Sequence, residues 1–304
     1  MKANRLLLDS AVTALVPAIW GSTYLVTTEL LPPDRPLLAA TVRALPAGLV
    51  LLALGRVLPT GIWWWRALVL GTLNIGAFFF LLFVAAYHLP GGVAALVGSV
   101  QPAVTILLAA LLLGDRVRVP HVVACVVAAG GVALLVLKST VQLDAVGVLA
   151  ALGGAVCMAS GIVLTKRWKR PVGVLLFTGW QLTAGGLVLL PALLVVEGLP
   201  DTITGTNALG FGYLIVLGSL FGYSVWFRGI DRLPAVAMSF LGFMSPIVAT
   251  FLGYLFLSQV LSPTQLIGAV VLIGSILLVQ LTPNKPAREV QTDPRGTGTS
   301  ASGK

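Results

Sequence analysis

Charged residues are scarce in this sequence. Asp, Glu, Lys and Arg together make up 10% of the 304 residues, whereas soluble proteins carry about 25%. Hydrophobic residues reach 58%, and the mean hydropathy is +1.01. A soluble fold of this size could not cover its surface with so few polar residues. The composition therefore excludes a water-soluble protein and predicts an integral membrane protein.

Cysteine and histidine are also rare, with two residues of each. Cys125 and Cys157 lie within apolar stretches, where small apolar fillers are expected rather than a disulfide framework. His88 and His121 stand at the ends of apolar segments, so they do not form a metal cluster with convincing spacing. The sequence also lacks a nucleotide-binding loop and clustered catalytic groups. We therefore expect no enzyme activity, no cofactor and no metal.

Long stretches without charge determine the expected topology. The 48 residues between Arg66 and Asp115 contain no Asp, Glu, Lys or Arg, and as one helix they would measure about 72 Å, against a bilayer core of about 30 Å. The stretch must therefore fold back, and residues 89–92 (LPGG) form the obvious break. The charge-free run from Leu233 to Asn284 breaks in the same way at 258–263. The sequence thus predicts an all-α protein with ten transmembrane helices, at about 11–31, 36–55, 67–88, 92–114, 119–137, 146–166, 172–195, 208–229, 235–257 and 264–281.

The distribution of basic residues accounts for the net charge of +9. With a cytoplasmic N-terminus, sixteen of the nineteen Lys and Arg residues fall on the cytoplasmic side: Lys2, Arg5, Arg56, Arg66, Arg116, Arg118, Lys166, Arg167, Lys169, Arg170, Arg228, Arg232, Lys285, Arg288, Arg295 and Lys304. Only Arg35 and Lys138 fall on the other side, and Arg43 lies within a span. Such asymmetry sets orientation in membranes. We predict a multi-pass protein of a bacterial plasma (inner) membrane with both termini cytoplasmic and no nucleic-acid partner.

The second half of the chain resembles the first. The pentapeptide GLVLL at 48–52 recurs at 186–190, an offset of 138, and later Gly and Pro positions coincide at an offset of 144. Each half holds five spans, so the second copy would enter the membrane in the opposite direction. Inverted repeats of this kind recur in transporters, with the substrate site near the midplane. The predicted units are a cytoplasmic N-terminus at 1–10, a first repeat at 11–137, a connecting loop at 138–145, a second repeat at 146–281 and a disordered cytoplasmic tail at 282–304.

The offset of 144 pairs Gly98-x-x-x-Pro102 with Gly242-x-x-x-Pro246. Proline removes one backbone hydrogen bond and clashes with the carbonyl four residues back, which belongs to glycine in both cases. The helix is therefore weakened in the middle of the fourth and ninth spans. Two interpretations stay open: static kinks that shape the packing, or a pair of gating hinges around a cavity.

Several motifs resemble the EamA family of the drug/metabolite transporter superfamily. They are Trp20-Gly21-Ser22-Thr23-Tyr24, Arg43 in the second span, Tyr87…Pro90…Ala94-Ala95-Leu96, Gln101-Pro102, and Leu111-Leu112-Leu113-Gly114-Asp115-Arg116. The resemblance covers about residues 10–281. It implies ten helices in two inverted five-helix repeats, a central cavity and export of small metabolites.

Two further segments, GSTYLVTT at 21–28 and LNIGAFF at 73–79, look most like the branch of indigoidine-type pigment exporters. The chain departs from the family pattern where the acid that closes the fourth span is Asp115 rather than Glu. Its counterpart in the second half is Gln259, so a role for paired acids there is doubtful.

Arg43 is the most informative single residue. It lies about 10 Å from the outer interface, where a charge costs at least about 2.5 kcal/mol. Its guanidinium could snorkel outward or bind carbonyl groups of other helices, or it could recognise a substrate carboxylate. Glu29, near the outer end of the first span, is a possible ion-pair partner and a possible proton site. Because Glu29 is the only acid within a span, the case for proton coupling is weak, and facilitated efflux is an equal alternative.

Other polar or aromatic side chains within spans could line a binding site. The predicted substrate-binding residues are Trp20, Tyr24, Arg43, Asn74, Gln101, Ser160, Trp180, Tyr223 and Ser245. Gln181 and Trp226 lie within spans as well. The alternative for the polar residues is hydrogen bonding between helices, and for the aromatic residues it is packing or contact with lipid.

These features favour a secondary transporter that exports a small amphipathic metabolite, such as a pigment, an amino-acid-like compound or a drug-like solute. The direction follows only from the family resemblance, so an importer is an alternative. A structural or sensory membrane subunit with this fold is another. The expected partners are a small-molecule substrate and membrane lipid, and the expected state is a monomer or weak homodimer.

Overall fold

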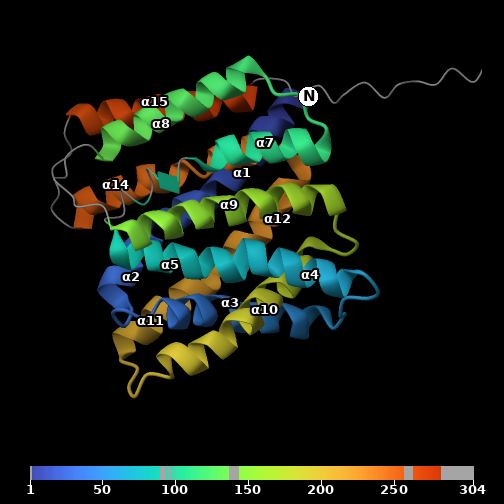
Figure 1. Cartoon of the computed structure of the whole chain (residues 1–304), viewed down its shortest axis with the longest axis vertical. Coiled ribbons are helices and arrows are strands. Elements are labelled where there is room, and N and C mark those ends of the chain that lie inside the picture. Colours follow the sequence, from blue (N-terminus) through green and yellow to red (C-terminus); the bar gives the residue numbers. More distant parts are fainter. Residues whose placement is uncertain are drawn as a thin grey trace, which may run out of the picture.

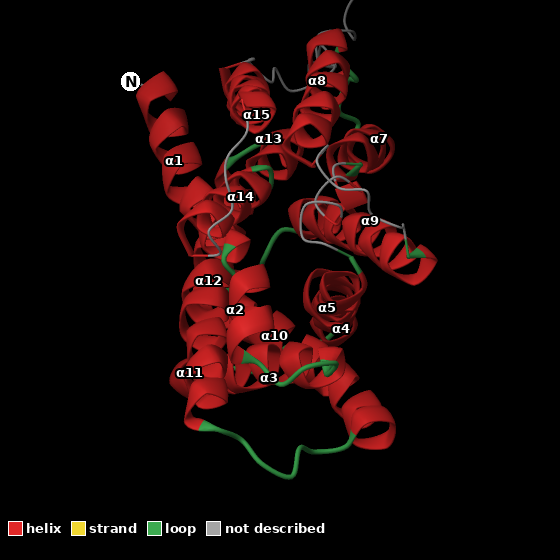
Figure 2. Ribbon diagram, turned by 90° about the vertical axis from the view of Figure 1, so that its left-hand side faces the viewer, coloured by secondary structure: helices red, strands yellow, loops and turns green. Residues whose placement is uncertain are grey.

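The computed structural model describes residues 2–89, 94, 97–98, 100–136, 144–256 and 263–281. Within these ranges the chain forms helices and no strand (Figure 2). The elements are α1 (Lys2–Gly21), α2 (Thr23–Leu30), α3 (Pro36–Gly55), α4 (Trp63–Gly71), η1 (Thr72–Ala77), α5 (Phe78–His88), α7 (Gln101–Leu113), α8 (Val119–Val136), α9 (Ala145–Trp168), α10 (Val174–Ala192), η2 (Leu193–Glu197), α11 (Gly205–Tyr213), η3 (Leu214–Phe221), α12 (Gly222–Arg232), α13 (Ala235–Leu241), α14 (Met244–Phe256) and α15 (Pro263–Leu281). The prediction of an all-α protein is thereby confirmed.

Among the described residues, six helical stretches are long and apolar enough to cross a membrane. They are Arg5–Leu30, Pro36–Gly55, Trp63–His88, Ala145–Trp168, Val174–Glu197 and Gly205–Arg232. Each overlaps one of the ten predicted spans, and each of the other four predicted spans contains a shorter apolar helix, namely Gln101–Leu113, Val119–Leu134, Ala235–Ala249 or Leu266–Val279. The predicted breaks at 90–92 and 258–262, most of the connecting loop at 138–145 and the tail at 282–304 lie outside the described residues.

The helices pack in pairs that join distant parts of the sequence. Helix α3 lies along α10, α8 lies along α15, and α9 contacts both α5 and α7 (Figure 1). Helix α1 packs against α12 and α14. Large apolar side chains point outward, such as Leu54, Val195 and Leu209, as expected where the solvent is lipid rather than water.

Small residues allow α3 and α10 to approach closely. A Cβ atom added at Gly48 would lie 2.4 Å from the backbone nitrogen of Thr183, and one at Gly186 would lie 2.7 Å from Cβ of Leu45. Helices in a membrane gain little from the hydrophobic effect on association, so close packing of this kind contributes much of the attraction between them. Both glycines belong to the repeated pentapeptide.

Some predicted spans are interrupted rather than continuous. The range 235–257 contains α13 and α14, which are separated at Gly242 and Phe243. Helix α7 begins at Gln101, within the predicted span 92–114. Val100 and Gly242 keep right-handed helical dihedrals, and the N–H of Ser245 donates to the carbonyl of Gly242, so the backbone hydrogen bonding is irregular at these points without a full break. The first span also begins earlier than predicted, because α1 starts at Lys2.

Three helical stretches have π-helical geometry, which the sequence pattern did not predict. They are η1 between α4 and α5, η2 at the end of α10, and η3 between α11 and α12. A π-helical turn changes the i→i−4 ladder and is common at functional sites. The segments η1 and η3 coincide in part at the offset of 144, since residues 72–77 correspond to 216–221.

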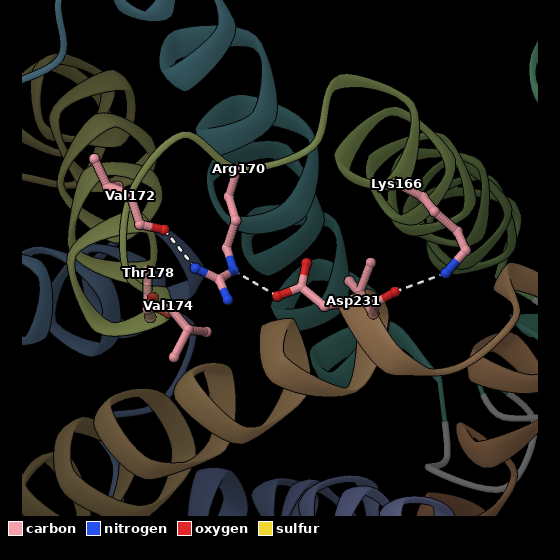
Figure 3. Close-up of polar contacts among 7 residues, drawn as sticks. Lys166, Arg170, Val172, Val174, Thr178 and Asp231 are labelled. Atoms are coloured by element: carbon pink, nitrogen blue, oxygen red, sulfur yellow. Dashed lines mark hydrogen bonds and ion pairs between the residues drawn. The ribbon is translucent and has the colours of Figure 1, made fainter. Parts of the chain in front are cut away.

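Polar contacts hold the helix ends where sixteen basic residues were predicted to gather. Arg170 pairs with Asp231 and donates to the carbonyl of Val172 (Figure 3). Asp9 of α1 accepts from Arg228 and Arg232 of α12, each at 3.0 Å. Lys166 at the end of α9 donates to carbonyl oxygens at the end of α12, a stabilising position for a cation. Several of these charges therefore also tie helices together.

A different polar contact lies at the beginning of α3. Both carboxylate oxygens of Glu197 accept backbone N–H groups in the first turn of α3, from Leu37 at 2.6 Å and Leu38 at 2.9 Å. These donors have no partner within the helix, and the helix dipole favours an anion there. Glu197 thus fixes the end of α10 and η2 against the start of α3.

Candidate functional site

A cavity of about 150 Å³ lies among helices from both halves of the chain. It is lined by Pro17, Trp20, Tyr24, Arg43, Phe78, Leu82, Ala85, Ala94, Gly98, Gln101, Pro102, Ala150, Ala151, Gly154, Ala155, Met158, Trp226, Ser239, Gly242, Phe243, Ser245 and Pro246. Most of these side chains are apolar, and a few polar groups interrupt them. This composition is typical of a small-molecule site, in which the polar groups orient the ligand.

The four predicted hinge residues all line this cavity. Gly98 and Pro102 approach it beside the start of α7, and Gly242 and Pro246 approach it beside the start of α14. One such Gly and Pro pair from each half of the chain therefore lies at the cavity. Broken helices around a central site are a recurring feature of secondary transporters.

Arg43 of α3 reaches the cavity and is nearly inaccessible, with 1% of its surface exposed. Its Nη2 donates to the carbonyl of Gly218 at 3.5 Å, and its guanidinium lies 4.4 Å from the centre of the Phe79 ring. Nε and Nη1 have no hydrogen-bond partner among the described residues. The side chain therefore does not snorkel to the surface, although it does contact a carbonyl of another helix.

The expected pair between Arg43 and Glu29 is not formed in the part of the chain that the structure describes. Glu29 lies near the end of α2 and is exposed, whereas Arg43 is buried beside the π-helical segment η3. The prediction assumed that the two adjacent spans would present these side chains to each other. Instead, Arg43 points toward α12 and η3 from the second half.

Aromatic side chains form one wall of the cavity. The Trp20 ring lies 5.1 Å from Trp226 and 4.9 Å from Tyr223, measured between ring centroids. Trp226 is 1% exposed, and its Nε1 has no partner among the described residues. The sequence placed Trp226 within a span but not in the site, because α12 carries Tyr223, Trp226 and Phe227 and the sequence does not show which of these rings faces a cavity.

The π-helical segments offer two carbonyl groups to side chains from other helices. Trp20 Nε1 donates to the carbonyl of Gly218 in η3 at 2.9 Å. The hydroxyl of Tyr223 donates to the carbonyl of Asn74 in η1 at 3.2 Å. Asn74 and Gly218 are related by the offset of 144. Each half thus accepts, at the corresponding position, a hydrogen bond from an aromatic residue of the other half.

Five of the predicted substrate-binding residues line the cavity and four do not. Trp20, Tyr24, Arg43, Gln101 and Ser245 are among the lining residues. The other four are Asn74, Ser160, Trp180 and Tyr223. Of these, the buried Asn74 amide donates to Gln181 at 2.8 Å and Thr165 at 3.2 Å, and Trp180 donates to the carbonyl of Val57. These contacts correspond to the alternative of hydrogen bonding between helices.

The apolar outward-facing helices and the cavity between them fit a polytopic membrane protein. Residues 10–137 and 145–281 match the EamA-like transporter family, and the chain belongs to this family. It is 52% identical over 266 residues to Protein PecM of Dickeya dadantii, covering 87% of this chain and 89% of that protein. It is 28% identical over 269 residues to the uncharacterized inner membrane transporter YedA of Escherichia coli K12, covering 86% and 87% of the two chains.

The fold is also known from experiment. A solved crystal structure that is 20% identical in sequence superposes with a TM-score of 0.75, covering 91% of this chain and 96% of that one. At this identity the likeness concerns the fold alone. Together with the relatives, the apolar helices identify a bacterial membrane protein of a transporter family.

Proposed function

We propose that the protein is a secondary transporter that exports a small amphipathic metabolite across the bacterial inner membrane by alternating access. The observation that carries this proposal is the cavity, because its lining combines predicted binding residues with the Gly and Pro residues of two interrupted helices. A transporter needs a site that can be reached from either side in turn, and broken helices beside the site allow local movement. Membership of the EamA-like family favours transport over catalysis.

The proposed architecture is ten membrane helices in two inverted five-helix repeats, at 11–137 and 146–281. The two segments that match the family, 10–137 and 145–281, support this division. The contacts between α3 and α10 support it as well. Gly48 faces Thr183 and Gly186 faces Leu45, and the offset of 138 converts each contact into the other. Such an exchange is expected when two copies face each other across a pseudo-two-fold axis.

Alternating access would use the paired breaks. In this account the segments around Gly98–Pro102 and Gly242–Pro246 bend in opposite directions, so that one half closes the cavity while the other opens it. The two aromatic hydrogen bonds to Asn74 and Gly218 carbonyls would hold the halves in register during this movement. Both termini lie in the cytoplasm in this topology, as the distribution of basic residues favours.

The size of the cavity favours the smaller end of the proposed substrate range. About 150 Å³ is enough for a benzene-sized body, so an amino-acid-like compound or small aromatic metabolite is favoured. Import of such a compound is the second candidate, since the geometry of an alternating site serves both directions.

The function can be tested by comparing metabolites inside cells and in the medium for deletion, wild-type and overexpression strains. An exporter predicts one solute that accumulates inside the deletion strain and outside the overexpression strain. The overexpressed Arg43→Gln variant, checked for normal membrane insertion, should not restore efflux. The reverse distribution would identify an importer, and unchanged metabolites in all strains across growth conditions would contradict transport.

A further inference from the structure

We infer that the cavity binds an organic anion with a single carboxylate and a flat apolar body. This inference rests on the proposed transport function and adds the charge and size class of its substrate. Three observations carry it: a buried cation without a counter-ion, an indole N–H without a partner among the described residues, and aromatic side chains in the lining of the same cavity.

The charge of Arg43 is unbalanced. Its side chain is 1% exposed, its strongest polar contact is a carbonyl at 3.5 Å, and Nε and Nη1 have no partner among the described residues. None of the residues that line the cavity in the described ranges is acidic. Burying an unpaired charge is costly, and proteins usually compensate it with a partner. A carboxylate matches the planar guanidinium in charge and shape and would occupy the free donors.

The rest of the cavity adds a hydrogen-bond donor. Trp226, which lines the cavity and is also 1% exposed, has an indole Nε1–H without a partner in the described part of the chain. The buried charge of Arg43 and this donor both oppose a cationic ligand.

The remaining walls describe the body of the ligand. Trp20, Phe78 and Phe243 line the cavity together with alanine and glycine residues, so the space between them is mostly apolar and bordered by flat rings. A cavity of about 150 Å³ accepts a benzene-sized group. One guanidinium neutralises one negative charge, which favours a monocarboxylate over a phosphate monoester that carries nearly two charges at neutral pH.

The inference can be tested with three compounds of the same shape and different charge. Benzoate is an anion, benzamide is neutral and benzamidine is a cation. Isothermal titration calorimetry of the full-length protein, purified in detergent, should give at least tenfold tighter binding for benzoate than for benzamide, and no saturable binding of benzamidine. Equal or tighter binding of benzamide or benzamidine would overturn the assignment, and so would the absence of binding by all three.

Arginine variants locate the effect. In Arg43→Gln the preference for benzoate over benzamide should disappear, while Arg43→Lys should keep part of it, because the charge remains but the bidentate geometry is lost. Arg66→Gln is the matched control, since Arg66 stacks on Trp63 and Trp168 and does not line the cavity. If Arg43→Gln does not fold, Trp226→Phe, which removes the indole N–H together with part of the ring, should weaken benzoate severalfold more than benzamide. An unchanged benzoate preference in the folded variant would overturn the assignment.

Transport in proteoliposomes separates this inference from the proposed function. Uptake of labelled benzamide without uptake of benzoate would keep the transporter and remove the anion site. Tight, Arg43-dependent binding of benzoate without movement of either compound would keep the anion site and contradict transport.

Discussion

The contact between α3 and α10 allows a quantitative prediction at two glycines. An alanine at Gly48 would place Cβ 2.4 Å from the backbone nitrogen of Thr183, where ordinary contacts begin near 3.4 Å. A backbone atom cannot rotate away, so the helices must separate locally by about 1 Å. Overpacking of this kind costs up to about 3 kcal/mol, and the better helix propensity of alanine returns about 1 kcal/mol. The net loss of stability should be about 2 kcal/mol.

Gly186→Ala should behave in the same way, because its Cβ would lie 2.7 Å from Cβ of Leu45. A loss of about 2 kcal/mol corresponds to a fall in melting temperature of ~4–8 °C by the scale for soluble proteins of 150–250 residues. Thermal unfolding in detergent, followed by tryptophan fluorescence, measures it. Gly130→Ala and Gly274→Ala are matched controls, because a Cβ at either glycine meets no atom within 4 Å. These controls should melt at or slightly above the wild-type temperature.

Two results would refute this reasoning. If Gly48→Ala melts with the controls, the close approach of α3 and α10 does not exist as described. If Gly48→Ala is destabilised and Gly186→Ala is not, the two contacts are not equivalent, and the repeat relation between them fails.

Three further predictions concern polar contacts. Tyr223→Phe removes the donor to the Asn74 carbonyl and should lower the stability of the fold by about 1 kcal/mol in a melting assay. Tyr213→Phe, which removes the hydroxyl that contacts Ser22, serves as a comparison in the same assay. Equal and negligible effects of the two variants would contradict a structural role for the Asn74 carbonyl in η1. Glu197→Gln should lower the melting temperature at low salt, because it removes an anion from the beginning of α3, and the difference should shrink at high salt; a difference that is independent of salt would contradict the electrostatic explanation. The pKa of Asp144 lies below its usual 3.8, mainly because its carboxylate accepts the backbone N–H of Gly147 and to a smaller extent because of its contact with His88. Asp144 therefore stabilises the fold fully above pH 3.8 and loses that effect as the pH falls through the lowered pKa. Asp144→Asn should therefore make the melting temperature less sensitive to pH in this acidic range.

The sequence predicted the class of fold well because its main signals are strong in a membrane protein. Charge-free runs longer than a bilayer require the chain to turn, and each predicted span overlaps described helices. The Gly-x-x-x-Pro pairs indicated weakened helices, and the structure shows irregular helical hydrogen bonding beside the cavity at these points. The sequence therefore indicated where glycine and proline weaken the helices, although it did not indicate how strongly.

Only some of the predicted site residues line the cavity, for a physical reason. Which face of a helix points to a cavity depends on packing with helices far away in the sequence, and an apolar helix shows little amphipathic pattern. Asn74 and Tyr223 bond to other helices, while Trp226 lines the cavity and its Nε1 has no partner among the described residues. The π-helical segments were not predicted either, because π-helical turns depend on tertiary contacts such as those of Trp20 and Arg43 with Gly218.

The central claim is that the cavity opens to each side of the membrane in turn. Single cysteines can test this after Cys125 and Cys157 are replaced by alanine: Ala151→Cys in the cavity wall, with Thr60→Cys and Thr202→Cys as exposed controls. Thr60 lies in the loop after α3, and Thr202 lies in the loop after α10 and η2. In the proposed topology these loops are on opposite sides of the membrane, so each control should react with a membrane-impermeant maleimide from one side only. The account predicts that Cys at position 151 reacts from the outside of right-side-out vesicles and also from the outside of inverted vesicles. Reaction from a single side under all substrate gradients, with both controls behaving as expected, would contradict alternating access.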